Sequence, residues 1–327
     1  MSVRTDHQDR TVISTGHRVT IPQPRRVGEL PPVSLTTTVP KEFVHRAAVA
    51  EVLLTEWSRT DDTRFTARAQ WPRGHSFFTP VRGEYHDPLI AIETIRQIGT
   101  LLAHTEFGVP LDHQFLMWDC AFTVEPEQLR IGDAPASIDL EVCFEEVRLR
   151  GRRLAGGRYR VVLRRDGRVA VTGGASFTCA APEVYRRLRG ERALGRAGQL
   201  PLTAPTAPQT VGRMSPTDVV LSPVGEPGRW QLRVDTRHPV IFDHPLDHAP
   251  GMLLVEAARQ AAAATLDCQD FLPVALGAEF KRYVELDAPC TIEAVRLPGD
   301  APAVLVTGHQ FGEPAFTATV TGAPPAR

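Results

Sequence analysis

The sequence predicts an α+β fold built twice, in which an antiparallel sheet wraps one long apolar helix in each copy. Three observations favour this fold. One part of the chain repeats another at a constant spacing, each copy contains one long apolar stretch, and segments with strand-like alternation follow each stretch. A repeat of this length indicates two copies of one domain, since solenoid units are much shorter.

The composition is that of an ordinary globular protein. The 327 residues are 42% hydrophobic and 23% charged, a length that suits about two domains. A formal net charge of −1 gives no overall field toward nucleic acid or an anionic membrane. Five cysteines without a CxxC spacing indicate neither a disulfide framework nor a zinc site. No apolar leader or membrane-length apolar run occurs, so we expect a cytoplasmic protein without nucleic-acid or membrane partners.

Two segments lie outside the repeated parts. Residues 1–34 are polar and rich in proline, and we expect an extended N-terminal arm. Residues 181–210 begin as a short basic helix and continue as a Pro/Ala/Thr-rich linker. The two domains are therefore expected at residues 35–180 and 211–327.

The repeat is clearest around the two apolar stretches. One constant shift, without a gap, pairs the charged and polar residues of the copies: His75 with His238, Glu93 with Glu256, Arg96 with Arg259, and Gln97 with Gln260. Residues 44–55 match residues 211–222 at a slightly different shift. A shared set of His, Glu, Arg and Gln at fixed spacing indicates a feature common to both domains.

Each apolar stretch predicts a helix, at about residues 88–104 and 250–266. In the second helix Glu256, Arg259 and Gln260 fall within about 100° of arc, and Leu, Val and Ala cover the other faces. Such a narrow stripe is unlike that of a surface helix, and burying unpaired charges would be costly. We therefore expect the stripe to face a polar cavity suited to acid–base chemistry on an anionic substrate. A solvent-facing ion pair is the alternative.

The loop before the second helix ends in Pro-Gly at residues 250–251. Glycine at this point would let a ligand approach the free N–H groups of the first helical turn. Such groups could polarise a thioester carbonyl as an oxyanion hole. We therefore place Gly251 in a candidate substrate site.

The segments after each helix alternate as strands do, and an Asp-Gly turn at residues 166–167 predicts a hairpin. The predicted strand segments are 115–124, 136–150 and 157–179 in the first copy, and 271–286, 290–297 and 301–322 in the second.

The stretch "HAPGMLLVEAARQ" looks like the loop-and-helix motif of the β-hydroxyacyl carrier protein dehydratases, which have the hot-dog fold. Together with "EFVHRAAVAEVLLTEW", "HSFF" and the tandem arrangement, it resembles the A-factor biosynthesis (AfsA) family of streptomycetes over about residues 35–325. The resemblance implies a tandem double hot-dog: two antiparallel sheets, each around a central helix, arranged as a pseudo-dimer.

The resemblance also implies an activity. It is transfer of a β-ketoacyl group from acyl carrier protein to the hydroxyl of dihydroxyacetone phosphate, in γ-butyrolactone autoregulator synthesis, without a cofactor or metal. The protein would be a monomeric pseudo-dimer or a homodimer. A dehydratase or thioesterase acting on acyl thioesters, and a non-catalytic acyl-binding regulatory module, are the alternatives.

The candidate site residues follow from the stripe, the loop and the resemblance. The catalytic candidates are Glu93, Glu256, Arg259 and His244, and the substrate-binding candidates are Gly251, Arg96, His75, His238 and Gln260. Either glutamate could be the base, and Arg259 could hold phosphate or orient the carboxylate. His244 is chosen for the proline after it, although its loop is two residues shorter than that of the dehydratases.

Three further patterns have simpler interpretations. The histidines at 238, 244 and 248 are spaced as metal ligands can be, but the loop is interrupted by proline and no cysteine joins it. His75 and His238 could instead anchor their loops. The basic segment 185–192 could dock an acidic carrier protein, although a solvated helix face is the simpler interpretation.

Overall fold

The computed structural model describes residues 36–151, 153–194 and 198–323. The arm expected at residues 1–34 lies outside these ranges. Residues 37–327 form one compact unit that contains both copies of the repeat.

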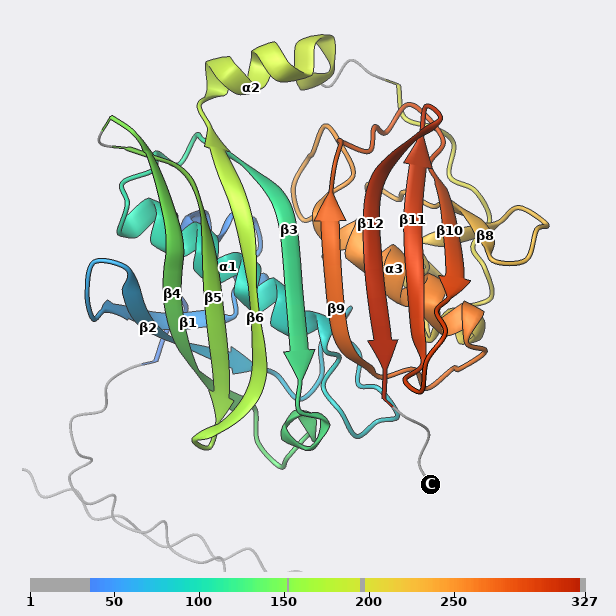
Figure 1. Ribbon diagram of the computed structural model, residues 1–327, viewed down its shortest axis with the longest axis horizontal. Coiled ribbons are helices and arrows are strands. Elements are labelled where there is room, and N and C mark those ends of the chain that lie inside the picture. Colours follow the sequence, from blue (N-terminus) through green and yellow to red (C-terminus); the bar gives the residue numbers. More distant parts are fainter. Residues whose placement is uncertain (1–35, 152, 195–197, 324–327) are drawn as a thin grey trace, which may run out of the picture. The chain divides into compact units, whose positions relative to one another are not determined.

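Twelve strands form one continuous antiparallel sheet, in the order β1-β2-β4-β5-β6-β3-β9-β12-β11-β10-β8-β7 (Figure 1). The first six come from the first copy and the last six from the second. Their bounds are β1 (Leu54–Arg59), β2 (Arg64–Trp71), β3 (Gln114–Val124), β4 (Ala136–Arg150), β5 (Arg153–Arg165), β6 (Arg168–Ala180), β7 (Leu221–Pro223), β8 (Arg229–Leu232), β9 (Pro273–Phe280), β10 (Thr291–Arg296), β11 (Ala303–Gln310) and β12 (Glu313–Gly322).

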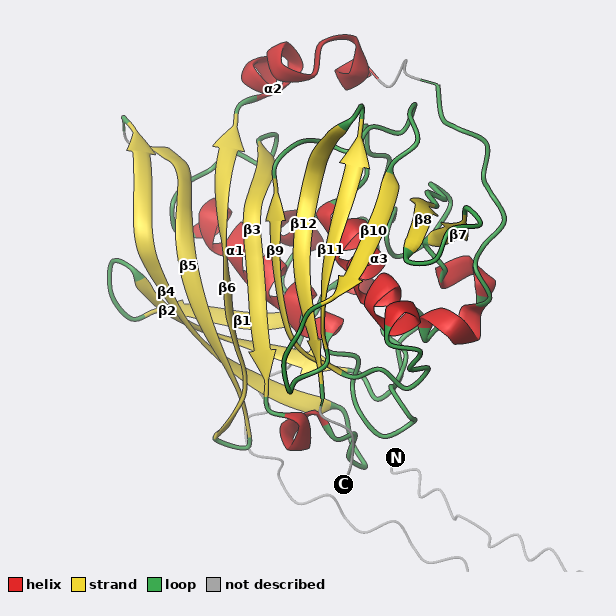
Figure 2. Ribbon diagram, turned by 45° about the vertical axis from the view of Figure 1, so that its right-hand side comes forward, coloured by secondary structure: helices red, strands yellow, loops and turns green. Residues whose placement is uncertain are grey.

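The two halves join where β3 pairs with β9, from Asp119 opposite Glu279 to Thr123 opposite Ala275. Each half has one long helix, α1 (Leu89–Thr105) and α3 (Gly251–Thr265), on the same face of the sheet (Figure 2). Both long helices were predicted to within one residue at each end. The predicted tandem hot-dog architecture is confirmed.

Both long helices are enclosed on nearly every side. In α1 only Arg96 and Thr105 escape full burial, and α3 is fully buried from Leu253 to Ala263. The close contact with the sheet follows from the sequence, because small residues such as Gly99 and the alanines of α3 leave room for strand side chains. At Gly99 no larger residue fits, because a Cβ there would lie 2.3 Å from the hydroxyl of Tyr159.

The strands after each helix were largely predicted, and the strands before each helix were missed. The Asp-Gly hairpin is present between β5 and β6, with positive φ angles of 50° at Asp166 and 74° at Gly167. The predicted strand at 271–286 is too long, because β9 ends at Phe280. The missed strands β1, β2, β7 and β8 are short or carry arginines and small residues on alternate positions, so their apolar signal is weak.

A short helix, α2 (Pro182–Arg189), follows β6 and begins the linker. It lies across one end of the sheet (Figure 1). In the described part of the chain, no helix has both the length and the apolar character that a membrane span requires.

Candidate active site

The two glutamates of the predicted stripe occupy matching buried clusters. Glu93 is fully buried and accepts hydrogen bonds from Arg46 (3.0 Å), Arg96 (2.7 and 2.9 Å) and Gln97 (2.7 Å). Gln97 in turn accepts a hydrogen bond from the backbone of Leu53. Each carboxylate oxygen of Glu93 therefore has at least one donor within the protein.

Glu256 repeats this arrangement in the second copy. It accepts hydrogen bonds from Arg213 (2.6 and 2.7 Å), Arg259 (2.7 and 3.0 Å) and Gln260 (2.6 Å). Gln260 accepts a hydrogen bond from the backbone of Val220, as Gln97 does from Leu53. The sequence repeat therefore persists at the level of single hydrogen bonds.

Both glutamates are held in the ionised form. Burial opposes their ionisation, but the paired arginines outweigh it and lower the pKa of Glu93 and of Glu256 to about 2. Neither side chain lines the cavity described below. This geometry favours a role of the two glutamates in fixing the arginines over a role as proton acceptors. Arg259 and Gln260 do not line the cavity either.

The matched histidines anchor their loops. His75 Nδ1 accepts hydrogen bonds from the backbone N–H groups of Phe77 and Phe78, and His238 Nδ1 accepts those of Val240 and Ile241. Their Nε2 atoms lie 3.4 Å from Glu51 and 3.1 Å from Asp218. These contacts agree with the structural interpretation of His75 and His238.

One cavity of about 330 Å³ lies between the two halves, a volume typical of small-molecule sites. Its polar lining includes Arg46 and Arg96 from the first half and His244 and His248 from the second. Its apolar lining includes Ile92, Gly99, Phe115, Met117, Cys120, Tyr159, Phe177, Leu246, Met252, Leu254, Val255 and Phe280. A cationic end and an apolar wall suit a substrate with an anionic group and an acyl chain.

The N-terminus of α3 opens onto this cavity. Pro250, Gly251 and Met252 line it, and no side chain caps the first turn of the helix. The N–H groups of Leu253 and Leu254 donate to the carbonyl of Pro250, whereas those of Gly251 and Met252 have no acceptor among the described residues. The helix dipole also makes this end partly positive. Gly251, a substrate-binding candidate from the sequence, therefore lies at the cavity.

The matching N-terminus of α1 is closed. Asp87 accepts a hydrogen bond from the backbone N–H of Leu89 (2.9 Å) and contacts Arg213 at 3.2 Å. Arg213 is 3% exposed, donates to the carbonyl of Phe77 and lies over the ring of Phe77 at 4.5 Å. Protein groups therefore occupy the space at this helix end, whereas the cavity lies at the N-terminus of α3.

Two Asp–His pairs stand before α3. Nδ1 of His244 lies 2.6 Å from Asp243, and Nδ1 of His248 lies 2.6 Å from Asp247. Asp243 also accepts a hydrogen bond from the backbone N–H of Ala47. Burial disfavours its ionisation, but the hydrogen bond from His244 and the charge of Arg46 keep the pKa of Asp243 below its ordinary value.

Each aspartate therefore fixes its histidine with Nδ1 as the donor and Nε2 as an acceptor. Within the described ranges, Nε2 of His244 has no hydrogen-bond partner, and the side chain is 39% exposed. His244 is the catalytic candidate from the sequence that both lines the cavity and has a free acceptor.

His45 and Arg46 were not predicted as site residues from the sequence. His45 lines the cavity, and its backbone has a left-handed conformation (φ 52°). Its counterpart in the second half is Gly212, which is also left-handed (φ 65°). His45 Nε2 lies 2.8 Å from Nε2 of His104, whose Nδ1 contacts the carbonyl of Val109. Burial and the neighbouring His104 lower the pKa of His45 to about 3.

A signal for both residues was present in the repeat. The matched segments 44–55 and 211–222 pair Arg46 with Arg213, and they pair His45 with a glycine. A non-glycine residue in the left-handed region is uncommon and often marks a functional site. The difference between the copies at this position pointed to the half that keeps a cavity.

Comparisons with known proteins match this chain over most of its length. The family described as A-factor biosynthesis hotdog domain (AfsA) matches residues 31–181 and 196–322. A protein of Streptomyces virginiae named 2-oxo-3-(phosphooxy)propyl 3-oxoalkanoate synthase is 57% identical over 290 residues, which are 88% of this chain and 98% of the relative. A protein of Streptomyces coelicolor with the same name is 41% identical over 87% of this chain and 91% of the relative.

Among solved structures, a putative oleoyl thioesterase from Lactobacillus plantarum aligns with a TM-score of 0.49 at 11% identity, over 82% of this chain and 99% of that one. That likeness is too distant to bear on the reaction. The family match and the identity to the two relatives suffice: the chain belongs to the A-factor biosynthesis hotdog (AfsA) family.

Proposed function

We propose that this protein is a 2-oxo-3-(phosphooxy)propyl 3-oxoalkanoate synthase, which transfers a 3-oxoacyl group from a thioester to the hydroxyl of dihydroxyacetone phosphate. The observation that carries the proposal is 57% identity to a relative of that name over 98% of the relative's length. The activity expected from the sequence agrees with the name of these relatives. The cavity between the halves is the place we assign to the reaction.

The donor thioester is oriented by α3 and by the apolar wall. Its carbonyl oxygen lies against the N–H groups of the first helical turn at Gly251 and Met252, which stabilise the negative charge that develops there. The acyl chain follows aromatic and aliphatic side chains such as Phe115 and Phe177. Burial of these methylene groups supplies about 0.8 kcal/mol each.

The acceptor phosphate is bound by Arg96, the role that the sequence analysis considered for Arg259. Arg96 lines the cavity, and its Nη1 has no partner among the described residues, whereas Arg259 is buried outside the cavity. Glu93 fixes Arg96 through Nε and Nη2, so Nη1 is left to bind the phosphate.

His244 is the base. Its Nε2 takes the proton of the acceptor hydroxyl while that oxygen attacks the thioester carbon, and Asp243 stabilises the imidazolium. The tetrahedral intermediate then collapses: the carbon–sulfur bond breaks, and the thiolate takes the proton from His244. The ester forms and a free thiol leaves, so atoms and charges balance without a cofactor.

The donor carrier is acyl carrier protein, the protein acts in the cytoplasm, and one chain forms the pseudo-dimer with domains at 35–180 and 211–327. In support, all strands of residues 54–180 lie in one half of the sheet, and those of residues 221–322 lie in the other.

The test is incubation of the purified protein with 3-oxoacyl thioesters of several chain lengths and dihydroxyacetone phosphate, followed by mass spectrometry. The proposal predicts the phosphorylated ester or its cyclised butenolide, and no release of free acid when dihydroxyacetone phosphate is left out. Thioester cleavage that does not depend on dihydroxyacetone phosphate would instead identify a thioesterase. Folded protein that consumes no thioester of any length would contradict both.

A further inference from the structure

The linker helix α2 is attached to the cavity by a buried arginine. Arg189 is 6% exposed, and its guanidinium donates to Glu285 (2.7 and 2.8 Å) and to Asp247 (3.0 Å). A fourth bond reaches the backbone carbonyl of Asp247 (3.0 Å). The simpler interpretation of segment 185–192, a solvated helix face, therefore does not hold for Arg189.

Tyr185 comes one turn before Arg189 and points to the same place. Its hydroxyl donates to Asp247 at 2.7 Å, on the carboxylate oxygen that also binds His248. Residues four apart share a helix face, so one face of α2 is directed to the loop before α3. The intervening Arg186 and Arg187 are exposed.

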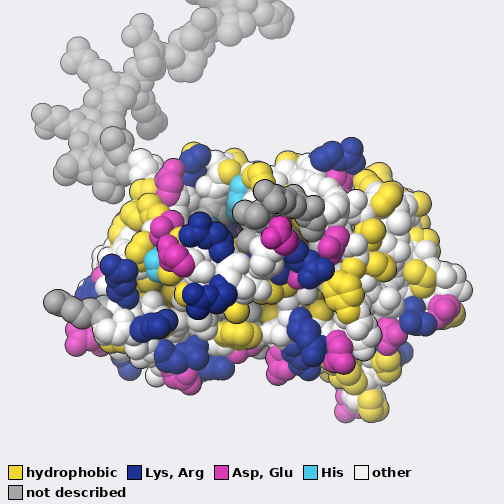
Figure 3. All heavy atoms as spheres, turned by 90° about the horizontal axis from the view of Figure 1, so that it is seen from above, with side chains coloured by type: hydrophobic (Ala, Val, Ile, Leu, Met, Phe, Trp, Pro, Cys, Tyr) yellow, Lys and Arg dark blue, Asp and Glu magenta, His cyan; other side chains and the backbone are white. Residues whose placement is uncertain are grey.

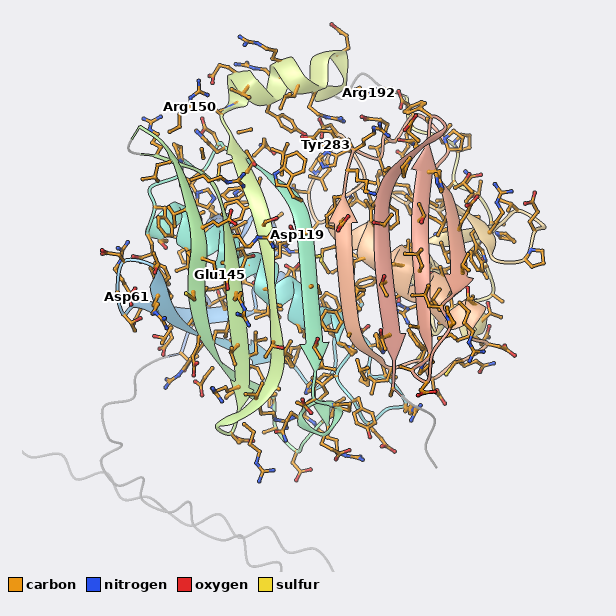
Figure 4. The ribbon with its side chains drawn as sticks, viewed as in Figure 1. Asp61, Asp119, Glu145, Arg150, Arg192 and Tyr283 are labelled. Atoms are coloured by element: carbon orange, nitrogen blue, oxygen red, sulfur yellow. The ribbon has the colours of Figure 1, made fainter. Side chains whose placement is uncertain are left out.

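Arg189 contacts His248 through two intermediates. Asp247 connects them on one side, since it accepts hydrogen bonds from both. Tyr283 connects them on the other: the Arg189 guanidinium lies 4.1 Å from the centre of its ring, and the ring packs edge-on against His248 at 4.7 Å. Figure 4 shows Tyr283 directly beneath α2, with Arg192 at the far end of this segment.

The electrostatics of this cluster depend on Arg189. Burial disfavours ionisation of Asp247, but the hydrogen bonds from His248, Tyr185 and Arg189 keep its pKa well below the ordinary value. Glu285 binds the same guanidinium, so two carboxylates share one buried cation. Without Arg189 they would lie close together with less compensation, and Asp247 would hold His248 less firmly.

Charged side chains of both signs gather at this end of the molecule (Figure 3). The residues that line the cavity at this end are His248, Lys281, Arg282 and Tyr283. Lys281 and Arg282 are exposed. His248 stands three residues before Gly251, at the first turn of α3. The thioester end of the donor would pass this point.

We infer that α2 is part of the active site and that Arg189 is a positioning residue, which holds His248 where it contacts the thioester end of the donor. The inference rests on the proposed function for the identity of the donor. His248 Nε2 has no partner among the described residues, so it is available to hydrogen-bond the donor. The covalent linker thereby contributes to the site in addition to joining the two halves.

The experiment is a double-mutant cycle with Arg189→Ala and His248→Ala. Each single variant is expected to raise the KM for the acyl thioester about tenfold and to leave the KM for dihydroxyacetone phosphate within about twofold. The double variant is expected to be no worse than the poorer single variant, because Arg189 acts through His248. Additive effects of the two substitutions would overturn the inference.

Three controls separate positioning from folding. Arg187→Ala lies on the same helix, is exposed and has no partner among the described residues, so it is expected to behave as the parent protein. Arg189→Lys keeps the charge but not the two-pronged geometry and is expected to recover only part of the loss. Thermal unfolding of every variant identifies any that is simply unfolded. An Arg189→Ala protein with the stability and the KM values of the parent would also overturn the inference.

A binding measurement separates this inference from the proposed function. Titration of the protein with an acyl-pantetheine thioester in a calorimeter reports donor affinity without turnover. If the parent protein binds this compound but makes no ester, the proposed function fails while the effect of Arg189→Ala on binding still tests the positioning role. Equal affinity of the parent and Arg189→Ala proteins would contradict it.

Discussion

The two halves contain the same buried cluster but differ in what surrounds it. In the first half Arg46 and Arg96 reach a cavity, whereas in the second half Arg213 and Arg259 are sealed among Phe77, Asp87 and Val211. The carboxylate and its two arginines are therefore a structural unit of the fold, present with or without a substrate site. Two features distinguish the half with a cavity. The first-half arginines face the open N-terminus of α3, and the first half has His45 where the second half has Gly212.

The largest expected effect is catalytic and concerns His244, which precedes the open N-terminus of α3. His244→Ala is expected to lower kcat by about 10²- to 10⁴-fold, the usual contribution of a general base. The matched change is His238→Ala, which removes a loop anchor of the same half and is expected to act mainly on stability. Steady-state kinetics beside thermal unfolding distinguishes the two, and equal losses of kcat per folded molecule would refute the assignment of His244.

The next difference concerns the arginines. Arg213→Ala leaves Glu256 and Asp87 buried with less compensation, so it is expected to cost about 3–5 kcal/mol of the free energy of unfolding. Arg96→Ala removes a half-buried arginine that faces the cavity. It is expected to raise the KM for dihydroxyacetone phosphate about tenfold to a hundredfold, with a smaller loss of stability.

Chemical denaturation and kinetics of these two variants sharpen the comparison. An Arg213→Ala protein that unfolds easily but keeps its KM values supports a closed second site. A rise in the KM for dihydroxyacetone phosphate in Arg213→Ala, equal to that in Arg96→Ala, would mean that both halves bind substrate.

The sequence allowed prediction of the parts that depend on periodicity. It predicted both long helices, the Asp-Gly hairpin and the narrow stripe of Glu93 and Arg96, because each has a local signature. It did not reveal which stripe meets a cavity, since Arg46, Asp87 and the loops that close one half come from distant segments. Arg189 was assigned to solvent for the same reason: its partners lie 58 and 96 residues away.

Acid is expected to act on both halves alike. The folded-state pKa of Glu93 and of Glu256 is about 2, below the ordinary value of 4.5. Their ionised forms therefore stabilise the fold fully above pH 4.5, and this contribution is lost as the pH falls from about 4.5 to about 2. The slope of unfolding free energy against pH should be shallower in Glu93→Gln and in Glu256→Gln, by similar amounts; an unchanged slope would contradict the buried ionised state.

The smallest expected effect on stability comes from His45→Gly, which makes the first half resemble the second. Glycine relieves about 1–2 kcal/mol of left-handed strain, while the contacts of His45 with His104 and Phe115 are lost. The net change in the free energy of unfolding should therefore be within about 1 kcal/mol. We expect a clear loss of kcat in this variant although its free energy of unfolding hardly changes. A variant with the kcat and the stability of the parent would show that His45 is not part of the site.

A crystal structure with an acyl-pantetheine thioester mimic and a phosphate tests the central claim most directly. The account predicts one mimic per chain, in the cavity between the halves, with its carbonyl oxygen against the N–H groups of Gly251 and Met252 and the phosphate on Arg96. A mimic bound at the N-terminus of α1 beside Asp87 and Arg213, or two mimics per chain, would contradict the conclusion that only one half of the repeat forms a working site.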